Sequence, residues 1–394
     1  MLQFPVLLLA YIISQFFRSF LAVIAPELSR ELALSPRDLG NMSAIWFWAF
    51  ALAQLYVGWS LDRLGPRRTM SAMMLAAVAG AIVLASAQGI AGCLLGMALI
   101  GFGCAPIYMG SLFLFARGGG GTERFALLSS LLLASGSLGN ALSSSPLAAA
   151  SQAFGWRPTF LAIAAATALA AGLLAWLLRD PPRIDPATDD QGLLAGLGAI
   201  LSLRALWPFL PITFVSYAVI LAERGLWVGP FLAEVHGLTP VPRGNAVLAM
   251  ALAMSVGALA YGWADRLGLG RKEVVTAGSL VTAAMFFLLG AAGGSSLPLA
   301  VATLALIGAA GMTYVQLMAH AKLFVPEALL GRGISTMNLL YFAGAAVTQQ
   351  VSGAAVAQMK AAGMSAAATY GALHEGFGLL LLAGTAVYLA ARRG

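Results

Sequence analysis

Twelve apolar stretches recur along the chain, and each is long enough to cross a membrane as a helix. About 20 apolar residues span the ~30 Å of hydrocarbon in a bilayer, where a backbone must satisfy its own hydrogen bonds. Only 9% of the residues are charged, against about 25% in an ordinary soluble domain. The sequence therefore predicts an all-α integral membrane protein with twelve transmembrane helices. The predicted spans are residues 4–25, 41–61, 69–88, 91–116, 124–149, 157–178, 206–233, 244–264, 273–293, 296–321, 332–357 and 375–392.

The second half of the chain repeats the first. The segment GWSLDRLGPRR at residues 58–68 returns as GWADRLGLGRK at residues 262–272. Arg18 returns as Arg224, an interval of 206 residues. Internal repeats of this length in a membrane protein indicate two related bundles. We expect two pseudo-symmetric six-helix bundles, at residues 1–179 and 206–394, joined by a cytoplasmic linker at residues 180–205.

The positions of the basic residues predict the orientation. Of the 22 Lys and Arg residues, 15 fall on the side that holds both predicted termini and the linker, five fall on the other side, and two lie inside spans. Because basic residues collect on the cytoplasmic side, we expect both termini in the cytoplasm, and we expect the protein in a bacterial inner membrane. The net charge of +7 is then a topology signal and does not indicate nucleic-acid binding.

The pattern Gly-x-x-x-Asp-Arg-x-Gly-x-Arg-Arg between the second and third predicted helices, with its second copy, resembles the major facilitator superfamily over the full chain. The resemblance implies a secondary transporter that works by alternating access, without a cofactor and without enzyme activity. The glycines of the motif would allow close helix approach, and its acidic residues would pair with basic residues or cap a helix. These residues would form a conformational latch, consisting of Gly58, Asp62, Arg63, Gly65, Arg67, Arg68, Gly262, Asp265, Arg266 and Arg271.

Three charged residues fall well inside predicted spans: Arg18, Glu223 and Arg224. A charge at mid-helix costs about 2.5–3.5 kcal/mol on insertion scales, and an arginine cannot lose its proton. In the family that the chain resembles, helices 1 and 7 line the central cavity, and organic-phosphate exchangers use an arginine on each. Arg18 and Arg224 together therefore predict a small anionic solute, such as a carboxylate or a phosphate ester, carried by exchange or proton symport. Glu223 is expected either to couple protons or to neutralise an arginine.

Polar and aromatic residues within the spans complete the predicted binding site. Tyr108 and Tyr314 are related by the same interval of 206 residues as the two arginines. The other members are predicted because buried amides and indoles need partners. They are Gln15, Trp46, Asn140, Asn338 and Gln349.

Three other functions fit the same fold. Copper import would use soft methionine and imidazole ligands, for which Met250, Met254, Met312, Met318 and His320 are candidates. Export of lipophilic cations is disfavoured by the excess positive charge, and a receptor would bind a solute without moving it. The chain lacks a phosphate-binding Gly-x-x-x-x-Gly-Lys loop, so ATP is not expected as the energy source.

Overall fold

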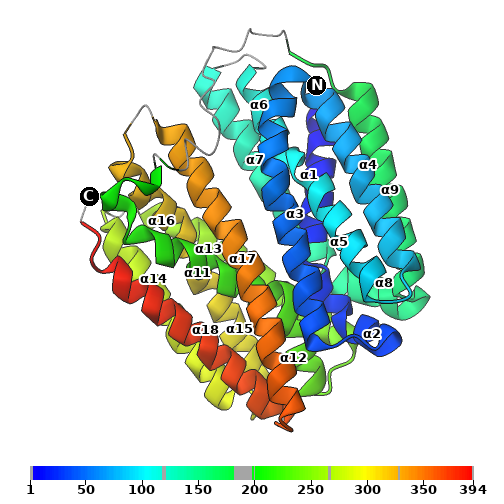
Figure 1. The fold of residues 1–394 in the computed structure, drawn as a ribbon, viewed down its shortest axis with the longest axis vertical. Coiled ribbons are helices and arrows are strands. Elements are labelled where there is room, and N and C mark those ends of the chain that lie inside the picture. Colours follow the sequence, from blue (N-terminus) through cyan, green and yellow to red (C-terminus); the bar gives the residue numbers. More distant parts are fainter. Residues whose placement is uncertain are drawn as a thin grey trace. The chain divides into compact units, whose positions relative to one another are not determined.

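The computed structural model describes residues 3–117, 121–181, 198, 200–264, 268–326 and 329–392, which are mostly helical (Figure 1). The chain divides into two compact units. Unit 1 consists of Met1–Leu34, Asn41–Asp189 and Pro240–Gly244, and unit 2 consists of Ser35–Gly40, Asp190–Thr239 and Asn245–Gly394. Nine helices in the described part of the chain are long and apolar enough to cross a membrane, or ten with one bent pair. The number of twelve spans therefore stays a prediction.

Unit 1 contains the helices of the first repeat, apart from residues 36–40 of α3. In it, α4 packs against α5 and α9, and α1 packs against α7. The approach of α1 and α7 is close at Gly139, because any side chain there would meet the backbone carbonyl of Ile12. The helices are α1 (Gln3–Ser19), α2 (Leu21–Leu32), α3 (Pro36–Arg63), α4 (Pro66–Ser86), α5 (Ile90–Cys104), α6 (Pro106–Arg117), α7 (Gly121–Leu142), α8 (Ser145–Phe154) and α9 (Trp156–Leu177).

Unit 2 repeats this packing order. Here α14 packs against α15 and α18, and α11 packs against α17. Gly344 on α17 lies against the carbonyl of Phe214 on α11, as Gly139 lies against Ile12 in unit 1. The main elements are α11 (Phe209–Ala222), η2 (Glu223–Trp227), α12 (Val228–Glu234), α13 (Pro240–Ala264), α14 (Arg271–Ala292), α15 (Leu297–Ala310), η4 (Gly311–Thr313), α16 (Tyr314–Ala321), α17 (Leu330–Ala361) and α18 (Ala366–Tyr388).

The last helix differs from its predicted range. The prediction began at residue 375, but α18 begins at Ala366, where the Ser365 side chain accepts a hydrogen bond from the Ala368 N–H. This N-cap starts the helix in a stretch that contains Thr369 and His374, which apolar composition alone did not identify as helical. Most of the predicted linker, residues 180–205, lies outside the described residues.

Two helices in each half are interrupted at equivalent places. The first is bent by 51° between α1 and α2, and the equivalent place in unit 2 is the π-helix η2 between α11 and α12. Pro26 follows the first break and Pro230 follows the second, and a proline cannot donate the backbone hydrogen bond of a regular helix. The other two breaks separate α5 from α6 at Pro106 and α15 from α16 at η4.

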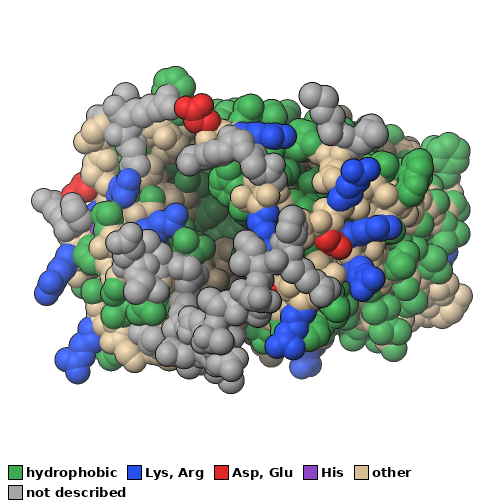
Figure 2. All heavy atoms as spheres, turned by 90° about the horizontal axis from the view of Figure 1, so that it is seen from above, with side chains coloured by type: hydrophobic (Ala, Val, Ile, Leu, Met, Phe, Trp, Pro, Cys, Tyr) green, Lys and Arg blue, Asp and Glu red, His purple; other side chains and the backbone are tan. Residues whose placement is uncertain are grey.

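One face of the molecule is rich in basic side chains. Figure 2, which views the structure from above Figure 1, shows Lys and Arg side chains spread over this face and few Asp or Glu side chains. The chain begins on this face, at the start of α1 (Figure 1). Two basic residues, Arg67 at the start of α4 and Arg117 at the end of α6, lie around one cavity of unit 1.

Candidate functional site

Arg18 lies just before the break in the first helix and is surrounded by aromatic rings. Its guanidinium carbon is 5.3 Å from the ring centre of Phe50 and 5.8 Å from that of Trp46. The Trp46 and Phe50 rings are stacked, with centres 5.3 Å apart. A cation over aromatic faces is attracted by the negative charge of the ring faces. The structure therefore brings together Arg18 and Trp46, both of which the sequence predicted.

The predicted Tyr108 belongs to a small cluster at the break between α5 and α6. The Tyr108 ring lies 5.6 Å from that of Tyr11, and the Tyr11 hydroxyl accepts a hydrogen bond of 2.6 Å from the Gln15 amide. Gln15, a predicted member of the binding site, thus donates its amide to a residue one turn earlier on the same helix. Asn140 on α7 accepts a hydrogen bond of 3.2 Å from Ser19 and helps to join α7 to α1.

Unit 2 contains the repeat-related arginine and tyrosine in equivalent local positions. Arg224 is the second residue of the π-helix η2 and is 3% exposed. Tyr314 begins α16, directly after the break, and its ring lies 4.5 Å from that of Tyr217. Tyr217 stands 206 residues after Tyr11. Each unit therefore holds one tyrosine pair that joins its first helix to its fourth. The sequence analysis found one member of each pair and missed the other.

Glu223 pairs with a histidine, and the sequence analysis did not predict this partner. Its carboxylate Oε2 lies 3.3 Å from Nε2 of His374, and both side chains are completely buried. The His374 ring packs edge-on against Phe231, with centres 5.0 Å apart. His374 was missed because the last helix was predicted to begin one residue after it.

The remaining predicted residues are placed as follows. On α17, Asn338 is half-buried and Gln349 is fully buried. His320, a ligand in the copper alternative, has its Nδ1 atom 2.6 Å from the Tyr388 hydroxyl and its ring packed against Phe209. Among the described residues, no group of three or more His, Cys, Asp or Glu side chains is arranged to hold a metal ion.

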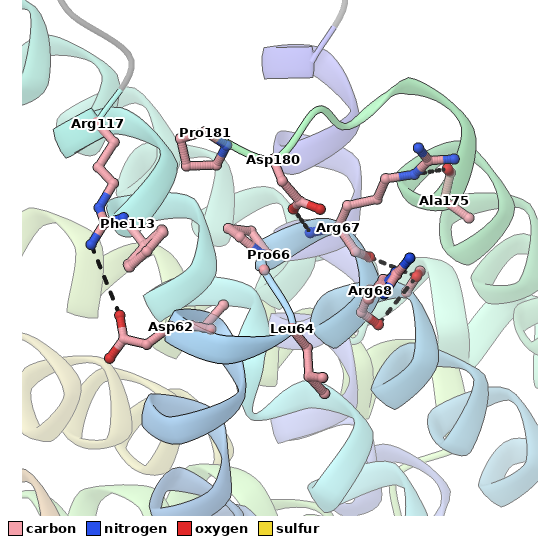
Figure 3. A pocket seen from close by; sticks show the side chains of 13 residues that line it. Asp62, Leu64, Pro66, Arg67, Arg68, Phe113, Arg117, Ala175, Asp180 and Pro181 are labelled. Atoms are coloured by element: carbon pink, nitrogen blue, oxygen red, sulfur yellow. Dashed lines mark hydrogen bonds and ion pairs between the residues drawn. The ribbon is translucent and has the colours of Figure 1, made fainter. Parts of the chain in front are cut away.

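The first copy of the repeated motif surrounds a cavity of about 450 Å³ in unit 1 (Figure 3). Asp180 accepts a 2.8 Å hydrogen bond from the Arg67 backbone N–H at the start of α4, and the Arg67 side chain donates to the Ala175 carbonyl near the end of α9. Asp62 lies 4.0 Å from Arg117. The carboxylate that caps α4 is therefore Asp180, whereas Asp62, which was predicted either to pair with a basic residue or to cap a helix, lies beside Arg117. Arg63 and Arg68 are exposed, and Arg63 lies near the Trp59 ring.

The second copy contacts helix ends in unit 2. Lys272, the second residue of α14, donates to the carbonyls of Leu389 and Ala391 just past the end of α18, both at 2.6 Å. Arg271 donates to the Ala319 carbonyl on α16. Arg67 and Lys272 thus make the same contact in the two units, from the second position of one helix to the end region of another. Asp265 and Arg266 lie outside the described residues.

The motif glycines do not have the role that was expected. A Cβ atom added at Gly58 or Gly262 would meet no atom within 4 Å, so the prediction that both allow close helix approach is wrong for this structure. Gly65 does have a conformational reason, because its φ of +85° favours glycine and its Cα faces the Asp180 carboxylate. The latch itself stays a prediction.

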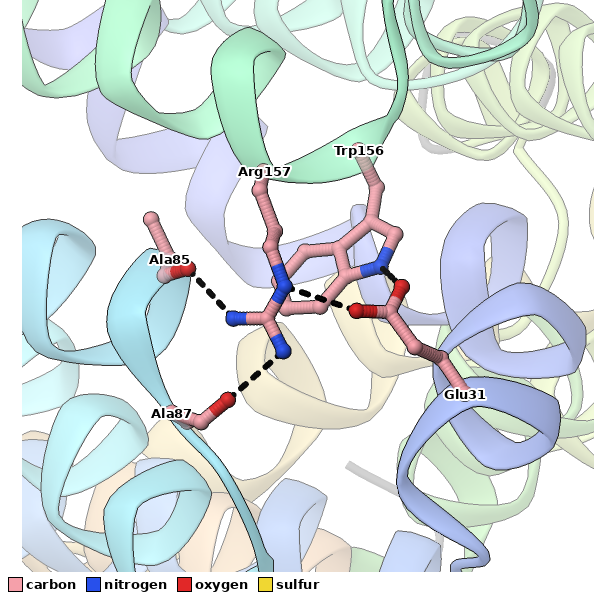
Figure 4. Close-up of polar contacts among 5 residues, drawn as sticks. All are labelled: Glu31, Ala85, Ala87, Trp156 and Arg157. Carbon is pink, nitrogen blue, oxygen red and sulfur yellow. Dashed lines mark hydrogen bonds and ion pairs between the residues drawn. The ribbon is translucent and has the colours of Figure 1, made fainter.

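Arg157 joins three helices at the other end of α4 (Figure 4). Its guanidinium donates to the carbonyls of Ala85 and Ala87 at the end of α4, at 2.6 and 2.8 Å. It also donates to Glu31 of α2 at 2.7 Å, and the Trp156 indole donates to the same carboxylate. This contact anchors α2, the segment beyond the break, to α4 and α9.

Comparisons with known proteins agree on the fold. The family model of the Major Facilitator Superfamily matches residues 7–349. A bacterial homolog of the human lysosomal transporter Spinster, in an inward-facing and occupied conformation, is 16% identical with a TM-score of 0.75, covering 98% of this chain and 96% of that chain. The nucleoside transporter NupG is 14% identical with a TM-score of 0.78, covering 98% and 99%. A D-xylose-proton symporter is 15% identical with a TM-score of 0.75, covering 96% of each. No curated protein matches the chain in sequence.

Proposed function

Because the chain belongs to the Major Facilitator Superfamily, and is therefore a multi-pass membrane transporter rather than an enzyme, we propose that it carries a small anionic solute by alternating access. The solute is a carboxylate, a phosphate ester or a similar oxyanion, moved by exchange or together with a proton. Arg18 and Arg224 bind it. The names of these solved structures refer to a nucleoside, to D-xylose and, for the Spinster homolog, to no solute, so the proposal rests on this chain's own residues.

One observation carries the proposal: the repeat-related arginines both lie at helix breaks. Arg18 is next to the bend between α1 and α2, and Arg224 is inside η2. Irregular backbone at membrane depth is tolerated where it is buried in protein or lines a water-filled cavity, and transporters place ion and substrate sites at such breaks. A guanidinium offers two parallel donors that match an oxyanion. A permanently charged side chain at a break in each half is therefore suited to an anionic ligand.

The tyrosines support the same assignment. Tyr108 and Tyr314 directly follow the breaks in the fourth helix of each half and are only half-buried. Their hydroxyls supply neutral hydrogen-bond donors beside the charged ones. An anion bound in this way cancels positive charge, which lowers the cost of closing the loaded carrier around it.

We place the basic face of Figure 2 in the cytoplasm, with both termini, and the protein in a bacterial inner membrane as a monomer. Basic residues concentrate on the cytoplasmic side of membrane proteins. Copper import gains no support from His320, whose Nδ1 atom is hydrogen-bonded to the Tyr388 hydroxyl and whose ring is packed against Phe209.

The proposal is tested by thermal unfolding of the purified protein in detergent with phosphate, phosphate esters, mono- and dicarboxylates, sulfate and nitrate. A ligand that binds only the folded state raises the unfolding temperature by mass action. We expect one anion class to stabilise the wild type and to lose that effect in Arg18→Gln and in Arg224→Gln. Arg30→Gln, at an exposed arginine of α2, is the matched control and should respond like the wild type. Stabilisation that persists in both site variants would contradict the proposal.

A further inference from the structure

The Glu223–His374 pair is a buried acid–base pair within unit 2. The two side chains lie 3.3 Å apart and neither is exposed. Neither carboxylate oxygen and neither ring nitrogen has a hydrogen-bond partner in the described part of the chain. Taking a single charge out of water costs several kcal/mol even after the protein relaxes. The number of protons on this pair is therefore tied to the other charges nearby.

Few charged or titratable groups surround the pair. Arg224 follows Glu223 directly on η2, and Tyr370 stands one turn before His374 on α18, with its ring 5.8 Å from that of Phe231. The charges of Glu234 and Lys360 balance each other in an ion pair of 2.5 Å. Further titratable groups occur on the described parts of the neighbouring elements. Tyr217 lies six residues earlier on α11, His236 bonds to the Gly293 carbonyl, Glu375 is exposed, and α14 carries Arg271, Lys272 and Glu273 in its first turn. Among these groups, Arg224 is the positive charge directly adjacent to Glu223 in the chain and the one that the proposed anion would neutralise.

The repeat indicates that the fold does not require this pair. Arg18 and Arg224 correspond, but the position equivalent to Glu223 in unit 1 is Phe17. Phe17 is fully buried and packs against Phe16 and Phe20. An apolar ring therefore fills this position in one half, while the other half holds a carboxylate and an imidazole at the cost of desolvating both. In addition, Glu223 begins a π-helix, an element found frequently at functional sites.

We infer that Glu223 and His374 form a proton-binding site whose proton is exchanged against the charge at Arg224, an inference that rests on the proposed anion site. Without an anion, the Glu223 carboxylate balances Arg224 and His374 is neutral. When an anion neutralises Arg224, one proton from water joins the carboxylate–imidazole pair and restores neutrality. When the anion leaves, that proton returns to water. The pair is then the site that couples anion transport to protons.

The first test needs no ligand, because Arg224→Gln removes the same charge that a bound anion cancels. The chain has three histidines, so ¹⁵N-histidine NMR with His374→Gln for assignment, together with infrared detection of a protonated carboxyl group, reports the state of the pair. We expect Arg224→Gln to carry about one more proton on the pair than the wild type at the same pH. Arg224→Lys, which keeps the charge, and Glu375→Gln, at an exposed carboxylate one residue from His374, should match the wild type. Unchanged signals in Arg224→Gln would overturn the inference.

The second test uses the wild type, and so does not depend on the folding of Arg224→Gln. Phosphate, succinate or benzoate is added to the protein in weak buffer with a pH indicator. We expect uptake of about one proton per bound anion, and in Glu223→Gln the anion should still bind but without proton uptake. Thermal stabilisation without proton uptake by the wild type would refute the coupling site and leave the anion site intact. If no anion binds, the proposed function fails, and the ligand-free comparison alone decides whether the pair responds to Arg224.

Discussion

The charged residues Arg18 and Glu223 have different kinds of neighbours. Arg18 lies over the rings of Trp46 and Phe50, whereas Glu223 faces the imidazole of His374. Aromatic faces attract a cation without adding a negative charge, so the two rings stabilise Arg18 and do not themselves cancel its positive charge.

The contact between Arg18 and Phe50 should be measurable by a double-mutant cycle with Arg18→Gln and Phe50→Leu. We expect a coupling free energy of about 0.5–2 kcal/mol in unfolding experiments, because leucine keeps the volume and removes the ring. The control cycle replaces Phe160, a buried ring on α9 that packs against Phe20, by leucine and should show coupling near zero. Equal coupling in the two cycles would contradict a specific cation–ring contact.

The sequence identified candidate site residues most clearly where the same residue type recurs at the repeat interval. Both arginines, Tyr108 and Tyr314 stood out because they occur twice at one interval. The repeat does not show in which direction a side chain points. On a helix, Gln15 can reach either Arg18 or Tyr11, since both are within about one turn, and only the tertiary structure shows that its amide meets Tyr11. His374 was missed because the last helix was predicted to begin at residue 375, whereas α18 begins at Ala366.

Among the elements, the α1–α7 and α11–α17 contacts each depend on a glycine that the motif does not contain. A Cβ atom at Gly139 or Gly344 would overlap the carbonyl of Ile12 or Phe214. The sequence interval between these glycines, 205 residues, marks them as another repeat pair. The α1–α7 and α11–α17 contacts are therefore built in the same way.

Gly139→Ala and Gly344→Ala should each lower the free energy of unfolding by about 1–3 kcal/mol, because the helices must separate to admit the methyl group. The matched control is Gly172→Ala on α9, where an added Cβ meets no atom within 4 Å. That change should be neutral or stabilising by up to about 1 kcal/mol. Unfolding of the three variants in detergent with increasing denaturant provides the comparison, and equal effects at all three positions would refute the packing argument.

The elements themselves were largely predictable, and their interruptions were not. Long apolar runs located helices in all the predicted ranges because lipid leaves no alternative to an internally bonded backbone. Composition does not show where such a helix breaks, since Pro26 and Pro230 follow their breaks by several residues. The motif glycines misled for a related reason: Gly58 and Gly262 have space beside them, and a sequence does not show which helix faces are in contact.

At the scale of the whole molecule, the repeat is visible as one packing scheme used twice. In each unit a basic side chain at the second position of one helix donates a hydrogen bond to a backbone carbonyl in the end region of another helix. Arg67 makes this contact with α9, and Lys272 makes it just past the end of α18. These contacts lie within the units. They predict a local role for the motif in addition to the latch between bundles that the family resemblance implies.

Hydrogen–deuterium exchange can separate these two roles. Arg67→Met should speed exchange roughly fivefold at the end of α9 and the start of α4, which corresponds to a loss of about 1 kcal/mol. Lys272→Met should do the same at the end of α18 and leave the helices of unit 1 unchanged, so each variant is the control for the other. Faster exchange in both units from either substitution would favour the latch and contradict a purely local role.

The buried pair of unit 2 also determines what can drive transport. If one proton accompanies each monovalent anion, the loaded carrier moves no net charge across the membrane. Solute accumulation would then follow the pH difference, about tenfold per pH unit, and would be insensitive to the membrane voltage. Glu223→Gln would move the anion alone, so its transport would become voltage-dependent, and a single oxygen-to-nitrogen replacement would change the force that the carrier uses.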